Sequence, residues 1–289
     1  MRGELVTTIT ADRVRLHGFL MDADPLPHDF ADAAVISHGL AGNFYSSSLL
    51  LEMASRLNRI GIATVIGNSR GHDFLNWTLR SGTTSTLGAA VEDVDECRFD
   101  VNGWAQYLVR QGFKRILLVG HSLGAIKSLY AQAWQPDSQA VGVVAVSPTR
   151  LNSDQFLESP GADQFRRTLV VAQELVKAGE PDRLMQVEFP FPTWMSAIAY
   201  LNKYGHENRF DWFGFIDRVD VPVAIYFGER ELNENAAFDG LDAAMQTGLS
   251  GNKNVHRETI PDADHFYVAS MDALCERMEA WIDGQGKLA

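Results

Sequence analysis

The pentapeptide Gly120-His121-Ser122-Leu123-Gly124 is the strongest chemical signal in the chain. It follows the apolar run Arg115–Val119 and precedes a stretch with helical character, Ala125–Ala131. A serine on a sharp turn between a strand and a helix has strained backbone angles, and its neighbours two positions away must be small to let the backbones pass. The Leu123 N–H would then donate to an oxyanion in the same space. We therefore predict that Ser122 is a nucleophile. The alternative is a phosphate-binding glycine turn, but the chain contains no dinucleotide or P-loop glycine motif.

A serine hydroxyl needs a base to take its proton. His265 follows the segment Arg257–Asp264 and precedes the last amphipathic stretch, which places it in a loop after the final strand, at the same sheet edge as Ser122. We predict that His265 is the general base. The other histidines are expected to serve elsewhere: His17 and His256 lie in strand-like segments, His28 in the first loop and His206 in an inserted segment, and the side chain of His121 should diverge from its neighbour.

The base in turn needs a carboxylate to orient it. Four candidates lie near the expected sheet edge, namely Glu229, Glu231 and Glu234 after the apolar run Val221–Phe227, and Asp264 beside the histidine. We favour Glu231, three residues after Gly228, and keep the others as alternatives. Each of these carboxylates could instead be an ordinary solvated surface group.

A second oxyanion donor is expected from the loop His38–Asn43, which follows the apolar run Ala33–Ser37. Glycines in this loop would let backbone N–H groups approach a substrate oxygen, and the Leu40 N–H is the expected donor. His38 is expected to orient the loop, with a catalytic role or a substrate contact as the alternatives.

The elements that must position these residues follow from the hydrophobic pattern. Residues 4–10 and 13–21 alternate apolar and polar side chains, which predicts an antiparallel hairpin. Further apolar runs fit strands of a parallel sheet buried on both faces, and helical periodicities lie between them. The runs are Ala33–Ser37, Ile62–Ile66, Ile116–Val119, Val141–Val146 and Val221–Phe227, and the helical stretches are 48–59, 90–111, 123–134, 236–248 and 267–283. The alternation predicts an α/β fold with a mostly parallel central sheet flanked by helices.

Residues 148–219 break this alternation. They contain no convincing strand, a helical stretch at 163–178 and many aromatic side chains, and they are too long for an ordinary connection. We predict a helical lid or cap inserted into a core formed by 1–147 and 220–289. The alternative is a packed helical subdomain with no role in binding. Two aromatic residues of this segment, Trp194 and Trp212, are candidate substrate contacts, as is Phe266 beside the expected base.

Composition and charge restrict the classes of protein and partner that fit this chain. The chain has 289 residues, of which 25 are basic and 37 acidic, so the formal net charge is −12, and 46% of residues are hydrophobic. This composition suits a globular protein with a sizeable core, and the lack of a basic run argues against nucleic acid or an anionic membrane as partner. The two cysteines, Cys97 and Cys275, lie in apolar-periodic stretches and are predicted to be buried thiols. With no apparent signal peptide and no apolar run long enough to span a membrane, we expect a cytoplasmic protein.

The ordered motifs resemble those of the α/β-hydrolase superfamily, over residues from about 30 to 285. The matching features are the His38-Gly39 loop, the stretch Asn68–Asp73, the Gly120–Gly124 elbow, Gly228-x-x-Glu231 and Asp264-His265. The resemblance implies a Ser–acid–His triad in that chain order and is nearest to lidded esterase or lipase-like members. Dehalogenases and epoxide hydrolases of this fold use Asp at the elbow, so Ser122 favours acyl chemistry.

Two departures from the family pattern bear on the site. Asn68 and Asp73 stand where the family's D-x-R-G-H-G stretch usually has Asp and Gly, which makes His72 and Asp73 candidate substrate contacts. Glu231 stands where Asp is commoner, although Glu also serves in that role.

The resulting prediction is a serine hydrolase that cleaves carboxylic esters through an acyl-enzyme intermediate, without a metal or other cofactor. A net negative field disfavours anionic substrates at long range, so the favoured substrate is a small neutral ester with an apolar acyl or alcohol portion. The same triad would also suit an acyltransferase or an acyl-thioester hydrolase, and peptides and lactones would use the same chemistry. A ligand receptor on a hydrolase scaffold is a third possibility. The oligomeric state is left open.

Overall fold

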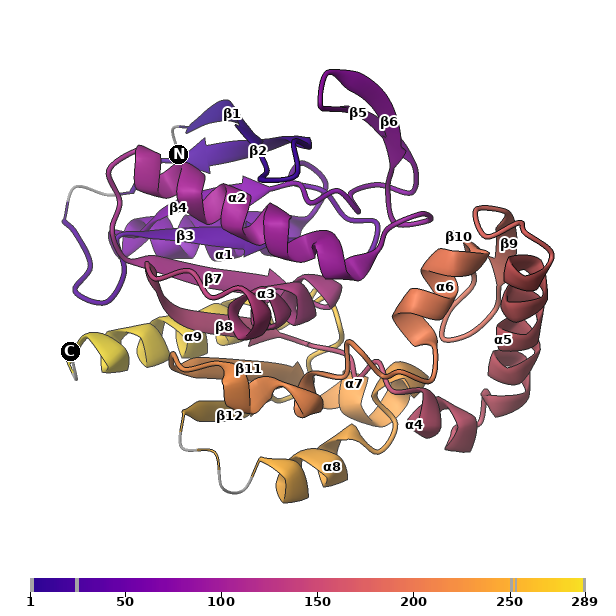
Figure 1. The fold of residues 1–289 in the computed structure, drawn as a ribbon. Helices are drawn as coiled ribbons and strands as arrows, with labels where there is room; N and C mark the ends of the chain where they lie inside the picture. Colours follow the sequence, from indigo (N-terminus) through magenta and orange to yellow (C-terminus); the bar gives the residue numbers. More distant parts are fainter. Residues whose placement is uncertain (1–2, 24–25, 250–251, 253, 288–289) are drawn as a thin grey trace.

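The computed structural model describes residues 3–23, 26–249, 252 and 254–287. Its main sheet has eight strands in the order β1-β2-β4-β3-β7-β8-β11-β12 (Figure 1). The six strands from β4 to β12 in this order run parallel, whereas β2 pairs with β4 and with β1 in antiparallel fashion. The strand bounds are β1 Gly3–Ile9, β2 Arg15–Met21, β3 Ala33–Ser37, β4 Ala63–Gly67, β7 Ile116–His121, β8 Ala140–Val146, β11 Val223–Gly228 and β12 Val255–Ile260. The predicted α/β class, the terminal hairpin and the mostly parallel sheet are confirmed.

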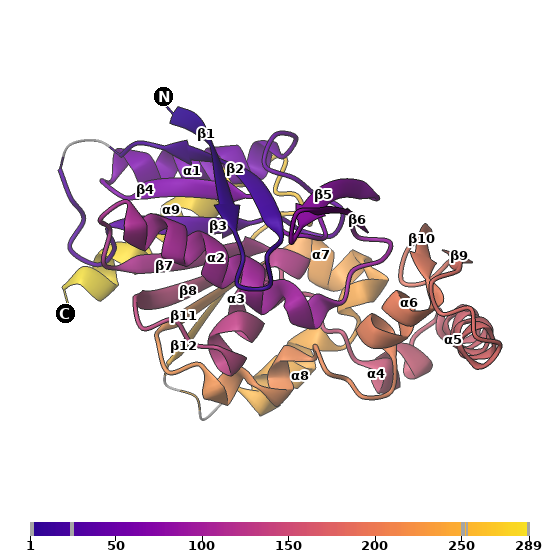
Figure 2. The same cartoon turned by 45° about the horizontal axis from the view of Figure 1, so that its top comes forward.

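Helices cover both faces of this sheet (Figure 2). On one face lie α1 (Ser48–Arg59) and α9 (Met271–Gly286), which pack with side chains from β3, β4, β7 and β11 into one apolar core. On the other face lie α2 (Cys97–Arg110) and α3 (Leu123–Trp134), which belong to a second and larger core. Both cysteines are free and buried, one in each core, as predicted. The central strands are apolar on both sides because helices cover them on both sides.

Two helices begin later than their periodicity predicts. The stretch predicted from residue 90 begins with a short 3-10 turn, Val94–Glu96, and α2 starts only at Cys97, because the Asp93 side chain caps the turn by accepting the Asp95 N–H. The stretch predicted from 236 becomes a 3-10 turn, Ala236–Phe238, followed by α8 (Leu241–Gly248). Gly240 separates the two with a φ of +69°, which ends any helical path through it.

Most of the insertion at 148–219 lies beyond the carboxyl ends of the parallel strands, beside the core (Figure 1), whereas its residues 212–218 pack against α3. It contains three helices, α4 (Ser153–Glu158), α5 (Ala162–Lys177) and α6 (Ala197–Tyr204), and two 3-10 turns, Trp212–Gly214 and Ile216–Arg218. The prediction that it holds no strand is wrong. Strands β9 (Leu184–Val187) and β10 (Thr193–Ser196) form a small antiparallel pair around the proline-rich segment. Strands of four residues are too short for a clear alternation.

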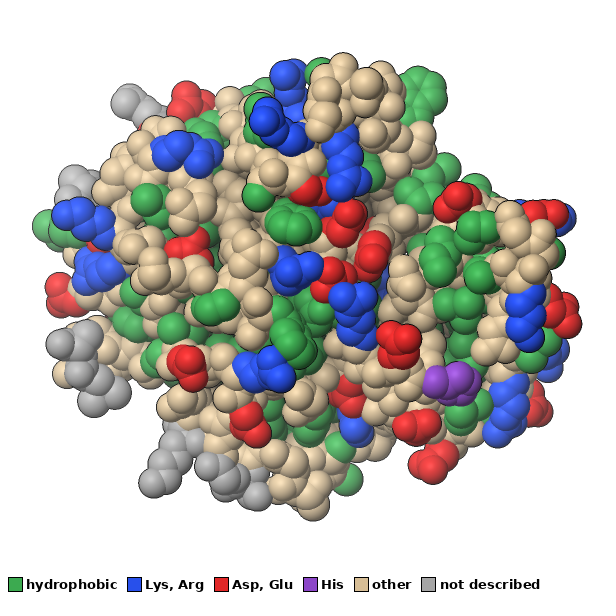
Figure 3. Space-filling view, in the orientation of Figure 1, with side chains coloured by type: hydrophobic (Ala, Val, Ile, Leu, Met, Phe, Trp, Pro, Cys, Tyr) green, Lys and Arg blue, Asp and Glu red, His purple; other side chains and the backbone are tan. Residues whose placement is uncertain are grey.

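A second unpredicted pair, β5 (Asn76–Arg80) and β6 (Thr83–Leu87), projects from the core as a mostly exposed hairpin (Figures 1 and 2). Its threonine-rich sequence buries no face completely, so it carries no strong hydrophobic signal. The short helix α7 (Glu229–Glu234) directly follows β11. Acidic and basic side chains are interspersed over the face seen in Figure 3. Within the described residues, no helix has the length and apolar character needed to cross a membrane.

Candidate active site

Ser122 occupies the sharp turn between β7 and α3, where the sequence places it. Its φ of +56° and ψ of −123° are strained for a residue with a side chain. The Ser122 N–H donates to the Val146 carbonyl at 2.8 Å, which fixes the turn to the end of the neighbouring strand β8. The sheet thus presents this hydroxyl at its carboxyl edge, at the start of a helix whose first N–H groups have no acceptor within the helix.

The two glycines of the elbow are required by close packing. A Cβ on Gly120 would lie 2.2 Å from the Gly124 carbonyl oxygen, and a Cβ on Gly124 would lie 2.3 Å from the Ser37 carbonyl oxygen. Both approaches are shorter than any real Cβ contact. The predicted need for small neighbours around the serine is therefore confirmed.

His265 and Glu231 form a hydrogen-bonded pair next to this elbow. His265 Nδ1 donates to Glu231 Oε2 at 2.7 Å, because a carboxylate can only accept. The imidazole then keeps its Nε2 lone pair, which is the arrangement that a general base needs. His265 follows β12 and Glu231 lies on α7, so both come from loops and helix starts at the carboxyl edge of the sheet.

The Glu231 carboxylate is buried, and three donors hold it in place. Besides His265 it accepts the Gly228 N–H and the Ser147 hydroxyl, each at 2.6 Å to Oε1. The Tyr267 hydroxyl lies 2.9 Å from Ser147 Oγ and extends this network. Sequence reasoning missed Ser147 and Tyr267. Ser147 directly follows β8, and this position at the carboxyl end of a parallel strand is the sequence signal that could have marked it as a site residue.

The other candidate acids do not contact the His265 ring in the described structure. Glu229 is exposed and accepts the Asp262 N–H, and Glu234 is exposed and pairs with Arg230. Asp264 accepts backbone N–H groups of its own loop. Of the four carboxylates considered, only that of Glu231 hydrogen-bonds to the His265 ring in the described structure.

The loop after β3 lies against Ser122. A Cβ on Gly39 would lie 3.2 Å from Ser122 Cβ, and the Gly42 N–H donates to the Gly39 carbonyl at 3.1 Å to close a tight turn. Leu40 lies within this turn and lines the same cavity as Ser122. The backbone N–H of Leu40 and that of Leu123 are thus carried by the two segments that flank the serine hydroxyl, as an oxyanion hole requires.

His38 holds this loop from behind. Its Nε2 accepts the Ser69 N–H at 3.0 Å, so its Nδ1 carries the proton and donates to the Gly39 carbonyl at 2.8 Å. Burial, with a further contribution from the nearby Lys127 ammonium, lowers the pKa of His38 to about 4. The ring is therefore neutral near pH 7, and its two nitrogens are used in positioning the loop rather than in proton transfer.

The unusual residues of the Asn68–Asp73 stretch also serve this loop. Asn68 Oδ1 accepts the Phe44 N–H at 2.9 Å. Asp73 accepts from the Asn43 amide at 2.7 Å and from the Tyr45 hydroxyl at 2.8 Å. Asn68 and Asp73, where the chain departs from the family pattern, thus hold the end of the loop after β3 and the residues that follow it.

His121 has a role that sequence reasoning did not find. Its side chain points away from Ser122, as predicted. Its Nε2 donates to the His265 carbonyl at 2.8 Å. The His121 and His265 rings lie 4.8 Å apart between centroids. Burial, together with the neighbouring His265, lowers the pKa of His121 to about 3, so it stays neutral while it positions the loop of the base.

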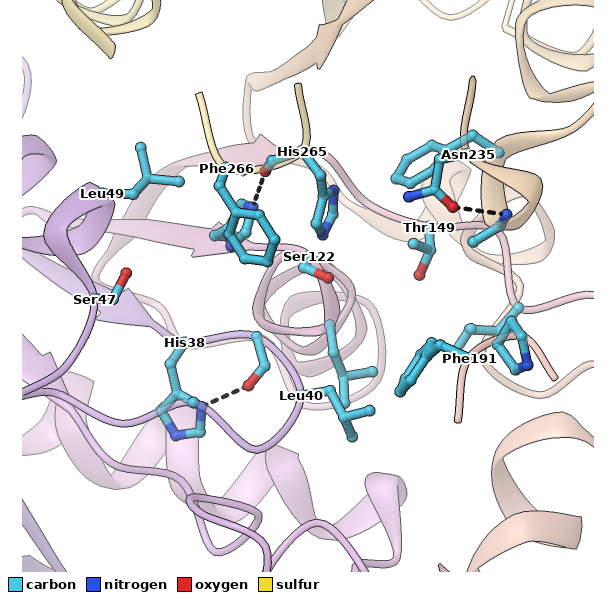
Figure 4. A pocket seen from close by; sticks show the side chains of 18 of the residues that line it. His38, Leu40, Ser47, Leu49, Ser122, Thr149, Phe191, Asn235, His265 and Phe266 are labelled. Atoms are coloured by element: carbon cyan, nitrogen blue, oxygen red, sulfur yellow. Dashed lines mark hydrogen bonds between the residues drawn. The ribbon is translucent and has the colours of Figure 1, made fainter. Parts of the chain in front are cut away.

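These groups open onto one cavity of about 630 Å³ between the core and the insertion. Figure 4 shows Ser122 and His265 at its centre, with Leu40 below them and Phe191 from the insertion on the opposite wall from Leu49. Most of the lining is apolar, as in pockets for small organic ligands. Core residues of the lining include His38, Leu40, Leu49, Phe238, His265 and Phe266, and residues of the insertion include Leu151, Phe156, Phe191, Lys203 and Tyr204.

The sequence matches the model of a known protein family over most of its length. Residues 16–277 match the model of the alpha/beta hydrolase family. The chain belongs to this family. No curated protein matches the hydrolase by sequence.

Solved structures resemble the hydrolase over nearly its whole length. The alpha/beta hydrolase GrgF from Penicillium sp. sh18 has a TM-score of 0.71 at 14% identity and covers 98% of both chains. Est1E from Butyrivibrio proteoclasticus, solved with ferulic acid bound, has a TM-score of 0.65 at 17% identity, over 96% of this chain and 98% of its own. The Pyrococcus furiosus esterase Pf2001 has a TM-score of 0.64 at 15% identity, over 97% and 90%. At such identities the similarity shows the fold alone.

The predicted substrate contacts of the hydrolase separate into two groups. Phe266 and His38 line the cavity, although both ring nitrogens of His38 are engaged by the protein. The structure does not bring the other four, Trp194, Trp212, His72 and Asp73, to the cavity wall. Trp212 is fully buried against Phe213, Trp194 is half exposed on β10, and the His72 ring lies at 2.9 Å from the Asp73 carboxylate. Most aromatic side chains of the insertion belong to the larger apolar core, where Phe210 and Phe215 contact Tyr130 of α3. A sequence pattern does not distinguish such core positions from a pocket wall.

Proposed function

We propose that the protein is a serine hydrolase of carboxylic esters, with Ser122 as nucleophile, His265 as general base and Glu231 as the residue that orients the base. One observation carries the proposal. His265, which hydrogen-bonds to the buried Glu231, and the strained elbow of Ser122 come from separate loops, yet His265 and Ser122 line the same apolar cavity. A structural ion pair would not need a nucleophile beside it, whereas acyl transfer to serine needs all three groups.

The proposed reaction has two halves. His265 Nε2 takes the Ser122 proton as Oγ attacks the ester carbonyl, and the Leu40 and Leu123 N–H groups stabilise the oxyanion, each worth roughly 3–4 kcal/mol in comparable enzymes. His265 then protonates the departing alcohol, which leaves an acyl-enzyme on Ser122. Water, deprotonated by His265, attacks this acyl-enzyme and releases the acid. Glu231 stabilises the imidazolium that forms in each half.

The insertion is proposed to act as a cap over this site. Leu151, Phe156 and Phe191 supply apolar surface on the side of the cavity opposite the core. This surface suits an apolar acyl or alcohol portion that extends from the scissile carbonyl, and it limits the water around the oxyanion.

Hydrolysis of 4-nitrophenyl esters of increasing acyl length tests the proposal. Ser122→Ala should abolish turnover and labelling by a fluorophosphonate, and Glu231→Gln should lower kcat by orders of magnitude while fluorophosphonate labelling is slowed. Ser138→Ala, which changes an exposed serine between α3 and β8 that does not line the cavity, is the matched control and should behave as wild type. Full turnover by Ser122→Ala would exclude the proposed mechanism.

A further inference from the structure

A buried cluster of charges connects the insertion to the core beside the cavity. Glu92 lies before α2, Lys127 on α3 and Lys203 on α6, and each of the three side chains is at most 1% exposed. The cluster holds two cations and one anion. Buried charges are costly unless they are paired, so the second cation needs an explanation.

Lys127 has its partners within the protein. Its Nζ forms a short ion pair with Glu92 Oε1 and donates to Ser69 Oγ at 3.2 Å. Through Ser69 this lysine supports His38 and the oxyanion loop. The pair Lys127–Glu92 is therefore complete as an internal ion pair.

Lys203 is left without such partners. Its Nζ lies 3.9 Å from Glu92 Oε2, beyond hydrogen-bond distance, and it makes no hydrogen bond to any residue that the structure describes. Glu92 Oε2 likewise has no hydrogen-bond partner among these residues, so the two groups do not close on one another. A lysine whose task was only to fasten the insertion would be expected to make this bond.

The position of Lys203 points to a ligand. This residue lines the cavity that contains Ser122 and His265, next to Tyr204 on the same helix. The start of helix α6 is attached to the core two residues before Glu92, because the N–H of its N-cap residue Ser196 donates to the Ala90 carbonyl at 2.7 Å. Burial lowers the pKa of Lys203 to about 8, with Glu92 opposing this effect and Lys127 adding to it, so the ammonium is mostly protonated at pH 7.

We propose that Lys203 binds a carboxylate of the substrate, so that the preferred ester carries an acid group on the arm that extends from Ser122 toward the insertion. This inference rests on the proposed serine hydrolase and adds a polar end to an otherwise apolar substrate. It departs from the wholly neutral ester that the net charge favours, because a buried cation acts at contact distance whereas the surface charge acts weakly through salt solution. A bound carboxylate would give the cluster two cations and two anions.

Matched ester pairs test the proposal. The acyl pair compares 4-nitrophenyl half-esters of dicarboxylic acids with 4-nitrophenyl esters of monocarboxylic acids of equal chain length. An alcohol pair places the carboxylate on the alcohol arm instead, with a methyl group in the neutral partner. In wild type, kcat/KM for one of the two acidic series should exceed that for its neutral partner at a defined chain length.

Lys203→Met should lower this acidic-to-neutral ratio by about tenfold or more, the size expected for a charge-assisted hydrogen bond in a dry site. The readout is the acidic-to-neutral ratio and not either rate alone, because Lys203 itself lines the cavity. The variant leaves Lys127 and Glu92 as a neutral pair, so it is expected to fold. Lys177→Met, which removes an exposed lysine of the same insertion, should keep the wild-type ratio. An unchanged ratio in Lys203→Met, or no acid preference in either wild-type series, would overturn the proposal.

A second measurement needs no variant at position 203. Dicarboxylates should inhibit wild-type hydrolysis of a neutral ester more strongly than monocarboxylates of the same length, and equal inhibition at all lengths would count against the role of Lys203. The neutral ester also separates the two proposals. If its hydrolysis depends on Ser122 while the acid preference is absent, only the role of Lys203 fails, whereas Ser122-independent hydrolysis removes the proposed function itself.

Discussion

Glu231 shows how far residue types and spacing lead at the scale of single residues. Its place three positions after Gly228 predicts a carboxylate at the sheet edge, but spacing alone leaves Glu229, Glu234 and Asp264 open. Burial separates them, because Glu231 accepts from the Gly228 N–H and Ser147 as well as from His265. Such a three-donor pocket is assembled from β8, β11 and the loop after β12, which are remote in sequence. For the same reason the sequence does not reveal that the Lys203 ammonium is buried without a hydrogen bond among the described residues, because in the chain it looks like an ordinary helical lysine.

His38 gives a prediction for stability at low pH. In the folded chain its pKa is lowered to about 4, first by burial and then by the nearby Lys127, against 6.5 for a free histidine. Between pH 6.5 and 4 the unfolded chain binds a proton at this position that the folded chain does not, so the unfolding free energy falls as the pH falls through this window. From pH 7 to pH 4.5 the loss from this group is expected to be about 2 to 3 kcal/mol.

Urea unfolding of wild type and His38→Gln at these two pH values measures this loss. The variant should be less stable at pH 7 and should lose about 2 to 3 kcal/mol less than wild type on acidification. Parallel pH profiles for the two proteins would show that His38 titrates normally in the fold. Ester hydrolysis at pH 7 provides a second readout, since a displaced oxyanion loop should lower kcat more than it changes KM.

At the scale of elements, the sequence predicts most of what is buried and little of what is exposed. The parallel strands β3, β4, β7, β8 and β11 fall on the predicted apolar runs within one or two residues, because strands covered on both faces must be apolar throughout. The hairpin β5–β6 and the pair β9–β10 are missed, since they are short and mostly exposed at one face. Helix starts shift where a side-chain cap or a positive φ decides them.

Arg70 connects the loop after β4 to α2 and to the β1–β2 turn, and its loss is predicted to lower the unfolding free energy. This buried arginine, in the loop after β4, donates to Asp100 on α2 through its backbone and its guanidinium, and to Asp12 in the β1–β2 turn at 3.0 Å. Arg70→Met would leave the buried Asp100 without its cation, at an expected cost of about 3 to 5 kcal/mol in unfolding free energy.

Chemical denaturation at pH 7 checks this value, with Arg166→Met as the control. Arg166 pairs with Asp163 on the exposed face of α5 at 2.9 Å, and loss of such a surface pair should cost less than about 1 kcal/mol. Similar costs for the two variants would contradict a special role for the buried pair. Arg70→Lys should recover only part of the loss, since an ammonium does not reproduce the forked contacts.

At the scale of the whole molecule, the net charge of −12 and the buried cation at Lys203 act on an acidic ester in opposite directions. The surface charge lowers the local concentration of anions over about 30 Å at 0.01 M salt but only about 8 Å at 0.15 M. The contact with Lys203 is buried and is screened much less.

Added salt should therefore raise kcat/KM for a half-ester of a dicarboxylic acid, by about twofold to a few-fold between these two concentrations, and leave the matched neutral ester unchanged. Initial rates at subsaturating substrate, with Lys203→Met alongside, measure both slopes. Because the surface field does not depend on position 203, the variant should show the same rise with salt from a lower starting value, whereas a fall with salt in wild type would mean that an exposed cationic surface, and not Lys203, recognises the acid group.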